Sequence, residues 1–571
     1  MPKFHLHYHK IPKIDTSFIN DSSYNTFDNE IQYNPFSLKN EQFYNPLYSN
    51  LFQLDNSNYN KISLNHKYHF IDNNRVYDIE NKQALEKHIF FKFSPLVDPL
   101  RYLVGKYEKS PSISVLPGIV DSSQNILSKM IDSNNVSYTD NFFNYLTSQL
   151  LHNHQFINST DYYGSMLCIQ DKFKLDISDD IEYLYESKFF NDNMNSLCSI
   201  SENTNDFINF ASRANKGRLQ FSAKSIHNIT CDTLPEIQAV PIDTTNNSDI
   251  IDVSGELVYE NTNITDKITL KNDDSDDSDD SIIDDSDDSI IDDSDDKVED
   301  AEFESDEEWE TDDSDISSCT ETETFAYINN FPVQAICIEK CVGTLDSLFE
   351  TGSLSSREGI CAIFQVIMIL LCYQQCFHFT HNDLHTNNIM FVHTDEPYLY
   401  YFYKKQHYKV PTYGKIFKLI DFGRAIYKFN SRTYCSDSFA PEGDAHTQYN
   451  CEPYFNSAKP RIDPNYSFDL CRLGCSIYDF IIDEDEDEDN FNDLQKIISL
   501  WCKDDYGKNI LYKKNGEERY PSFKLYKMIA RTVHQHTPET QLKLPFFKDF
   551  ETTKDEVDKS VIDIDAIPTY F

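Results

Sequence analysis

The chain has 571 residues, with 95 acidic and 50 basic side chains and a formal net charge of −45. Its length exceeds what one hydrophobic core supports, so roughly two to four structural units are expected. Because neutralising phosphates requires clustered Lys and Arg, this charge excludes a nucleic-acid-binding protein and favours basic partners.

Cysteines and apolar runs indicate the compartment. The 14 cysteines form no CxxC pair, which is typical of free thiols in a reducing compartment rather than of zinc ligands. The N-terminal sequence MPKFHLHYHKIPK has no apolar signal-peptide core. The longest apolar run, at about 360–373, is too short to span a bilayer and predicts a buried helix. We therefore expect an intracellular, cytoplasmic protein with no membrane association.

The first part of the chain changes character near residue 60. Residues 1–60 are rich in Asn, Tyr, Ser and Phe without periodicity, which predicts an extended or weakly ordered arm. Residues 67–80 (KYHFIDNNRVYDIE) predict two strands around an Asn-Asn turn, because Asn tolerates the left-handed backbone of such turns. The apolar run HIFFKF at 88–93 predicts a third strand of the same sheet.

The middle of the chain alternates ordered patterns with polar sequence. Apolar spacing over 138–152 predicts an amphipathic helix entered through Asp140, followed by a strand-like run at 156–169. Polar sequence then extends over 169–325. Within it, 273–315 carries 25 acidic residues against one lysine, so self-repulsion predicts disorder over 273–318. A buried strand is predicted at 331–340, and helical patterns dominate the C-terminal region.

Two motifs carry the chemistry: HNDLHTNNIMF at 381–391 and KLIDFG at 418–423. Phosphoryl transfer requires a carboxylate at the attacking hydroxyl and oxygen ligands that hold Mg²⁺ on the phosphates. Asp383, Asn388 and Asp421 supply this set of groups. Either motif alone is a weak signal, whereas both in this order are specific.

In order and content these motifs resemble the protein-kinase superfamily. The resemblance is extended by FDLCRLG at 468–474, similar to the family's helix whose Asp holds the catalytic-loop backbone, and by IEKCVGTLD at 338–346, similar to the hinge that meets adenine. It implies that Asp383 acts on the substrate hydroxyl and that Asn388 and Asp421 bind the metal. Within the hinge, the resemblance places nucleotide-binding residues at Glu339, Cys341 and Asp346.

Three features suggest the branch of the family. His385, a further catalytic candidate, stands where most protein kinases have Lys, as in haspin-type and small-molecule kinases. The Tyr-rich insertion at 398–414 also resembles haspin. The Asn-, Ile- and Tyr-rich composition is similar to that of kinase-like proteins of giant nucleocytoplasmic DNA viruses.

The resemblance is weaker in the N-terminal half. Lys92 is the candidate for the lysine that contacts the α- and β-phosphates, the alternative being an edge-strand lysine facing solvent. No glycine precedes Gly105, so backbone amides of the turn at 72–75 would have to cover the phosphates. The predicted helix offers only Asp140 and Gln149 where the family has a glutamate.

Other positions carry expectations about regulation. Asn382 replaces an arginine that pairs with a phosphorylated activation loop in many relatives, so activity is expected not to require that phosphorylation. Ala440-Pro441-Glu442 is either the segment terminator or a chance match. The acidic tract is interpreted as a solvated insertion, with docking of a basic substrate or phosphorylation at Ser281 and Ser289 as alternatives.

The predicted fold is α+β and two-lobed, like protein kinases. Its expected parts are the arm at 1–60, a small lobe at 61–168, an insertion at 169–325, a last strand and hinge at 326–341, a helical lobe at 342–550 and a tail at 551–571. The predicted function is ATP- and Mg²⁺-dependent phosphorylation of Ser or Thr in a protein substrate, and the net charge favours a basic one. A pseudokinase scaffold and a small-molecule kinase remain as alternatives.

Overall fold

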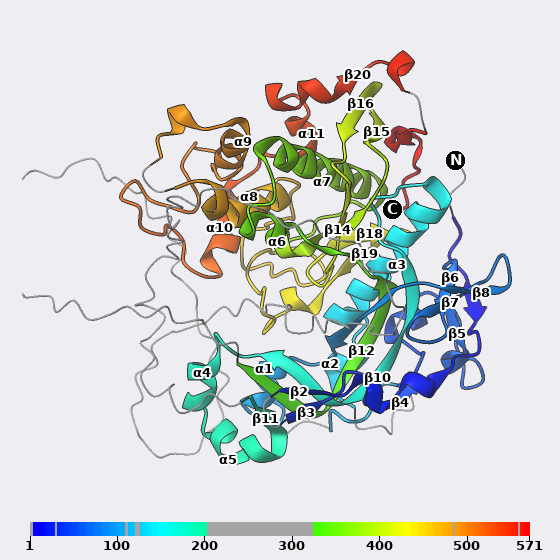
Figure 1. Cartoon of the computed structure of the whole chain (residues 1–571). Helices are drawn as coiled ribbons and strands as arrows, with labels where there is room; N and C mark the ends of the chain where they lie inside the picture. Colours follow the sequence, from blue (N-terminus) through cyan, green and yellow to red (C-terminus); the bar gives the residue numbers. More distant parts are fainter. Residues whose placement is uncertain are drawn as a thin grey trace, which may run out of the picture. The chain divides into compact units, whose positions relative to one another are not determined.

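The computed structural model describes residues 4–28, 31–108, 112–119, 126–201, 324–483, 486–557 and 560–571 (Figure 1). All of them belong to one compact unit, Met1–Thr262 with Glu323–Phe571. A second unit, Asn263–Thr322, lies outside the described residues. The predicted disorder of the acidic tract at 273–318, and Ser281 and Ser289 within it, therefore lie outside them as well.

The protein is a mixed α+β protein. Its described residues form several small, mostly antiparallel sheets and eleven α-helices. The helices are α1 (Pro99–Leu103), α2 (Ser128–Ile131), α3 (Val136–His154), α4 (Ile181–Glu186), α5 (Lys188–Leu197), α6 (Leu345–Glu350), α7 (Ser356–Phe377), α8 (Phe468–Ile481), α9 (Asp493–Trp501), α10 (Lys524–Thr532) and α11 (Pro538–Gln541).

The largest sheet has the strand order β11-β12-β10-β4, with β9 also paired to β12. Its strands are β4 (Leu38–Gln42), β9 (Ile89–Pro95), β10 (Tyr162–Asp176), β11 (Cys198–Ile200) and β12 (Phe325–Glu339). From Phe331 to Ile338 every residue of β12 is buried, because the strand lies in the middle of the sheet and is covered on both faces. The predicted buried strand at 331–340 is thus confirmed, and the run predicted at 156–169 forms a strand that begins later and runs further.

Helix α3 lies against β10 and β12, as Figure 1 shows. The predicted helix is confirmed, but its predicted entry through Asp140 is wrong. The Asn135 side chain caps the helix by accepting a hydrogen bond from the Ser137 amide, and the Val136 amide donates to the Asp437 carboxylate at 3.0 Å. Asp140 consequently lies inside the helix, where it is 1% exposed.

The N-terminal segment corrects one expectation. Predicted as a weakly ordered arm, the described part of 1–60 instead packs on the main sheet: β4 pairs with β10, and the Phe36 ring lies 5.2 Å from that of Phe91. Leu38 and Leu47 are buried. The segment also forms β1 (Tyr8–Lys10), β2 (Thr26–Asp28) and β3 (Ile31–Tyr33), with β1 pairing β5 (Ile62–Leu64). The segment is ordered by contacts with distant strands, so its order could not be predicted from a local apolar period.

A separate sheet follows. The two strands predicted within 67–80 are confirmed as β6 (Tyr68–Phe70) and β7 (Arg75–Asp78), which pair antiparallel. The third strand of this sheet is β8 (Gln83–Glu86). The run HIFFKF was expected there but lies in β9 and pairs with β12, because Phe91 and Phe93 are buried against the central sheet.

The C-terminal half contains α7 and several short sheets. Strands β13 (Gly343–Thr344), β14 (Ile389–His393) and β17 (Lys415–Leu419) form one sheet, and β18 (Ile426–Phe429) pairs with β19 (Arg432–Cys435). The Tyr-rich insertion forms the hairpin of β15 (Tyr398–Tyr403) and β16 (Gln406–Pro411). The tail at 551–571 adds β20 (Glu551–Thr552) and β21 (Ile562–Asp563) to that hairpin, and its Tyr570 ring lies 4.6 Å from Phe4.

Helix α7 was predicted as a buried helix from its apolar run. Among the described residues it is the one helix long and apolar enough to cross a membrane, and 94% of its most apolar window is buried inside the protein. A capping box of Ser355 and Glu358 begins it. Its burial is what a core helix requires.

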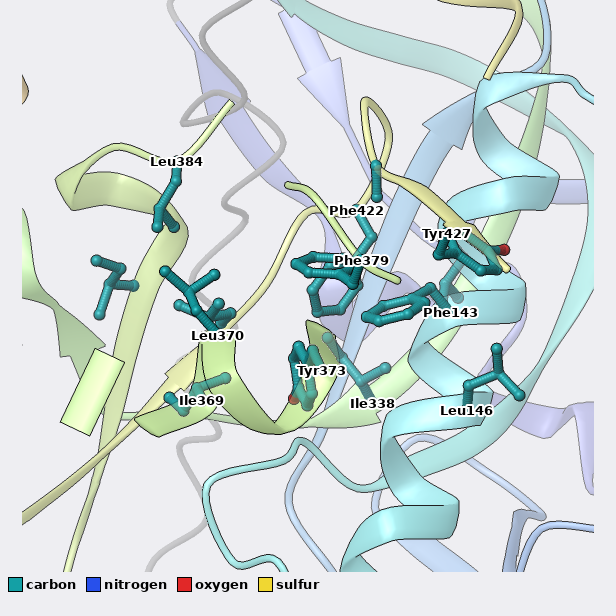
Figure 2. Packing of buried hydrophobic residues seen from close by; sticks show 14 of the residues in the cluster. Phe143, Leu146, Ile338, Ile369, Leu370, Tyr373, Phe379, Leu384, Phe422 and Tyr427 are labelled. Carbon is teal, nitrogen blue, oxygen red and sulfur yellow. The ribbon is translucent and has the colours of Figure 1, made fainter. Parts of the chain in front are cut away.

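An aromatic cluster joins α3 to the segment after β17 (Figure 2). Phe422 is fully buried, with its ring centroid 4.7 Å from that of Phe143 and 5.9 Å from that of Phe379. Tyr427 packs on Phe143 at 4.7 Å. These contacts fix the depth of the residues on either side of Phe422, including Asp421.

Two buried histidines make stability sensitive to acid. The rings of His66 and His69 stack at 3.7 Å, and burial lowers the pKa of His66 and lowers that of His69 to about 3. In the unfolded chain both would titrate near 6.5, so their contribution is complete above pH 6.5 and is lost as the pH falls towards 3. We expect the free energy of unfolding to fall by up to about 1.4 kcal/mol per pH unit for each histidine.

The measurement is urea unfolding between pH 7.5 and 4.5. His66→Phe should flatten the slope against pH, because it removes one titrating group, whereas the exposed control His393→Gln should not. Equal slopes for His66→Phe and wild type would contradict the prediction.

Candidate functional site

Asp469 of α8 holds the backbone of the 381–388 loop. Its carboxylate accepts hydrogen bonds from the amides of His381 at 2.9 Å and Asn382 at 2.8 Å. Asp469 is fully buried, and burial raises its pKa against the opposing effect of these two bonds and of His381. Two consecutive amides bound to one carboxylate fix the peptide plane just before Asp383.

Asn388 and Asp421 lie at the ends of neighbouring strands. Asn388 directly precedes β14 and Asp421 closely follows β17; the two strands pair antiparallel, and the Ile420 amide donates to the Asn388 carbonyl at 3.1 Å. The Asn388 Nδ2 donates to the Asp383 backbone oxygen at 2.9 Å and lies 3.0 Å from His385 Nε2. The side-chain oxygen of Asn388 is thereby left as the group available to a metal.

Lys92 lies where β9, α3 and the segment after β17 meet. Its Nζ is 2.7 Å from Asp140 Oδ2 and 2.8 Å from Asp421 Oδ1. The Lys92 side chain is 11% exposed and that of Asp421 26%. The alternative of a lysine that faces solvent is therefore wrong. Among the described strands β9 pairs only with β12, but the Lys92 side chain points inward to Asp140 and Asp421.

Asp140 is the carboxylate of α3 that pairs with Lys92, in the helix where the sequence offered no glutamate. One methylene shorter than Glu, it reaches Lys92 because α3 lies close to the 421–423 segment: the Phe422 amide donates to Asp140 Oδ1 at 3.0 Å, and a Cβ on Gly423 would lie 3.0 Å from Val136. Gln149, the other candidate, instead bonds Asn153.

Charges at this junction are mutually dependent. Burial acts against the charge of Lys92, but Asp140 and Asp421 outweigh it and raise the pKa of Lys92. Burial raises the pKa of Asp140, although Lys92 opposes the shift. For Asp421, burial is outweighed by Lys92, so its pKa is lowered and it stays ionised at neutral pH. An ionised, partly exposed carboxylate is a suitable ligand for a hard cation.

The backbone at Asp421 is unusual. Its φ is +58°, in the left-handed region that costs side-chain-bearing residues energy and that Asp tolerates better than most. Phe422, the next residue, is anchored in the aromatic cluster, with the His381 ring 5.7 Å from its own. Burial of Phe422 thus holds Asp421 in this conformation beside Lys92.

Asp383 has two partners that sequence reasoning missed. Tyr526 of α10 donates its hydroxyl to Asp383 Oδ1 at 2.7 Å, and Arg424 Nη1 lies 3.5 Å from Oδ2. Arg424 also binds Asp444 at 2.8 Å. Arg424 directly follows the KLIDFG motif, and this position could have indicated that it lies near the site. Tyr526 lies 143 residues from Asp383, and no local pattern marks it.

The predicted hinge residues differ in their surroundings. The Glu339 carboxylate lies 2.6 Å from Lys418 Nζ and accepts the Asp161 amide at 3.2 Å, so the side chain is engaged by its neighbours. Cys341 is partly exposed, and burial raises the pKa of its thiol to about 12, which keeps it protonated. Asp346 accepts a hydrogen bond from the hydroxyl of Thr386, beside the 381–388 loop.

The turn at 72–75 does not offer the amides that were expected to cover phosphates. The amides of Asn74 and Arg75 donate to the Asp72 carboxylate at 3.0 and 2.7 Å, and Arg75 also forms an ion pair with it. This expectation is wrong, because the turn's own carboxylate already occupies the position an anion would take.

Asn382 and Glu442 were the other residues with predicted roles. Asn382 is fully buried, donates to the Arg424 carbonyl at 2.9 Å and accepts from the Tyr449 hydroxyl at 2.8 Å. These hydrogen bonds let the uncharged Asn382 side chain hold the segment after Asp421 against the 381–388 loop. The Glu442 side chain is 81% exposed and lies 3.6 Å from Arg101, so the 440–442 match makes no buried ion pair.

The residues present suit a divalent cation held jointly with phosphates. No group of three or more His, Cys, Asp and Glu side chains that could hold a metal occurs in the described ranges. Asn388 and Asp421 are one amide and one carboxylate, and Mg²⁺ is commonly bound by only one or two carboxylates together with substrate phosphates and water. Two surface cavities, of about 610 and 350 Å³, are lined by other residues, including Tyr77 and Tyr403 respectively.

Comparison with known proteins identifies no relative that carries this site. No protein-family model matches the sequence, and no curated protein matches it significantly.

Proposed function

We propose that the protein is an ATP- and Mg²⁺-dependent protein kinase that transfers the γ-phosphoryl group to Ser or Thr of a protein substrate. The observation that carries the proposal is the junction at Lys92, whose Nζ lies within 2.8 Å of carboxylates from two distant segments. Asp421, one of them, lies beside Asn388 at the ends of paired strands. A phosphate-binding lysine, a metal-binding pair and a nearby carboxylate are what this reaction requires.

Each residue has a part in this proposal. Lys92 binds the α- and β-phosphates and orients them. Asn388 and Asp421 would hold Mg²⁺, which neutralises charge on the phosphates when bound. Asp383 accepts the proton of the acceptor hydroxyl, or orients that hydroxyl for attack, and Asp469 fixes its backbone. Backbone groups of the hinge at 339–341 meet adenine, with Asp346 nearby.

The arrangement of elements supports a two-lobed kinase fold. The strand order β9-β12-β10, with α3 against the sheet, corresponds to a small lobe whose lysine strand pairs with the strand leading into the hinge. Helices α7 and α8 and the sheet of β14 and β17 correspond to the larger lobe. In this proposal, 61–168 and 326–341 belong to the first and 342–550 to the second, with an insertion between them.

A pseudokinase scaffold is the second candidate, and one observation favours it. The amides of Asn74 and Arg75 in the 72–75 turn bind Asp72, so this turn does not substitute for a glycine-rich loop. Loss of that loop weakens the hold on phosphates, but the presence of Asp383, Asn388 and Asp421 favours transfer. A basic protein substrate is proposed on the net charge of −45.

The test is transfer of labelled phosphate from ATP with Mg²⁺ to histones, casein and a panel of small metabolites. Wild type should label protein, and Asp383→Asn should reduce the rate by at least about 100-fold. The matched control is Asp395→Asn, the same change at an exposed carboxylate. Binding of ATP without transfer would contradict the proposal in favour of the scaffold, and label on a metabolite alone would indicate a small-molecule kinase.

A further inference from the structure

Asp383 has side-chain contacts that the proposed function does not use. Its carboxylate is only 24% exposed, and both of its oxygens have protein neighbours. The shorter contact, 2.7 Å, comes from Tyr526, which belongs to a different helix from every residue given a part above.

Tyr526 is itself held on several sides. It is 4% exposed, and its ring is stacked on Phe523 with centroids 5.6 Å apart. The guanidinium groups of Arg472 and Arg424 lie 5.1 and 5.6 Å from the ring centroid. Because the ring is immobilised by packing and by two cations, its hydroxyl has a fixed position.

The hydroxyl of Tyr526 links two charged groups. Arg472 Nε donates to the Tyr526 oxygen at 2.9 Å, and the hydroxyl in turn donates to Asp383 Oδ1 at 2.7 Å. A hydroxyl that accepts from a cation becomes a better donor, so the chain from Arg472 to Asp383 is cooperative. Arg472 lies on α8, the helix that also carries Asp469.

We propose that Tyr526, supported by Arg472, is a positioning residue that fixes the Asp383 carboxylate in one rotamer. Asp469 holds the backbone on the amino side of Asp383, and Tyr526 holds its side chain. With Oδ1 engaged, the orientation of Oδ2 towards an acceptor hydroxyl is determined before substrate binds. Errors of about 1 Å at such a group cost about 100-fold in rate, so this hold matters for transfer.

The catalytic consequence rests on the proposed kinase function, whereas the positioning itself does not, and the experiment separates them. Tyr526→Phe removes only the hydroxyl. The matched control is Tyr512→Phe, whose hydroxyl also donates to a carboxylate, Asp479 at 2.8 Å, at an exposed site. We expect Tyr526→Phe to lower kcat by about 10- to 100-fold with KM for ATP and peptide within about twofold, and the control to change neither.

A double-mutant cycle for unfolding tests the contact without any activity. Asp383→Ala and Tyr526→Phe should be non-additive by at least about threefold in the unfolding equilibrium constant. Additive effects would overturn the proposal, as would a wild type that transfers phosphate together with a Tyr526→Phe variant of unchanged kcat. If the cycle is non-additive but the wild type transfers no phosphate, the kinase function is refuted and the positioning of Asp383 by Tyr526 still stands.

Discussion

Replacing Asp421 with asparagine is expected to lower the rate of phosphoryl transfer by about 100- to 1,000-fold, with a higher Mg²⁺ concentration needed for half-maximal rate. The change removes the carboxylate that would bind the metal and leaves an amide of nearly the same shape. Because Asp and Asn have almost the same volume, the substitution creates no cavity at this side chain, which is 26% exposed. Rates measured across a Mg²⁺ titration, and after chelation with EDTA, give the result.

The control separates lost chemistry from lost structure. Asp421→Asn also removes one of the two ion pairs of Lys92, so its thermal unfolding has to be measured alongside. Asp395→Asn, at an exposed site, should behave as wild type in both measurements. A rate for Asp421→Asn within about tenfold of wild type at saturating Mg²⁺ would remove Asp421 from the metal site.

Replacing Lys92 with methionine is expected to lower the free energy of unfolding by about 3–5 kcal/mol at pH 7, the largest loss among the substitutions described. Methionine fills much the same space but carries no charge, so Asp140, which is 1% exposed, would lose its cation and face Asp421. Burial already raises the pKa of Asp140. Without Lys92 that pKa would rise further, so the deficit against wild type should shrink as the pH falls and Asp140 becomes protonated.

Urea unfolding of Lys92→Met between pH 7 and 5 measures this effect. The double variant with Asp140→Asn should regain part of the stability, because a neutral amide replaces the unpaired charge. Lys82→Met, at an exposed lysine, is the control for the loss of a surface charge. A deficit below about 1 kcal/mol for Lys92→Met would show that the ion pairs do not hold this junction.

Local sequence patterns were sufficient for the elements whose partners lie nearby. The strands at β6 and β7 follow from alternation around an Asn-Asn turn, and α7 follows from its apolar run. The motifs containing Asp383, Asn388 and Asp421 could be found because they place, at short spacing, the residue types that the proposed phosphoryl transfer would require. The mixed α+β class followed from the same patterns.

Other features could not be found locally. The N-terminal segment has no period, yet Phe36 and Leu38 are buried because the sheet of β10 offers them a partner. No motif surrounds Asp140 in the sequence. Its short side chain reaches Lys92 only because α3 lies close to Phe422. Tyr526 in α10 carries no signal at all.

The sequence by itself determined which side chains could do chemistry: two aspartates and an asparagine in two short motifs, and one lysine among apolar residues. The tertiary structure decided which of them meet. Lys92, Asp140 and Asp421 come from positions 48 and 329 residues apart along the chain, and their distances of 2.7 and 2.8 Å depend on how β9, α3 and the segment after β17 pack. The periodicity of apolar residues indicates only which face of an element is buried. The contacts of Lys92 with Asp140 and Asp421 depend instead on how three elements are placed relative to one another, and the packing of Phe143 on Phe422 helps to set that placement.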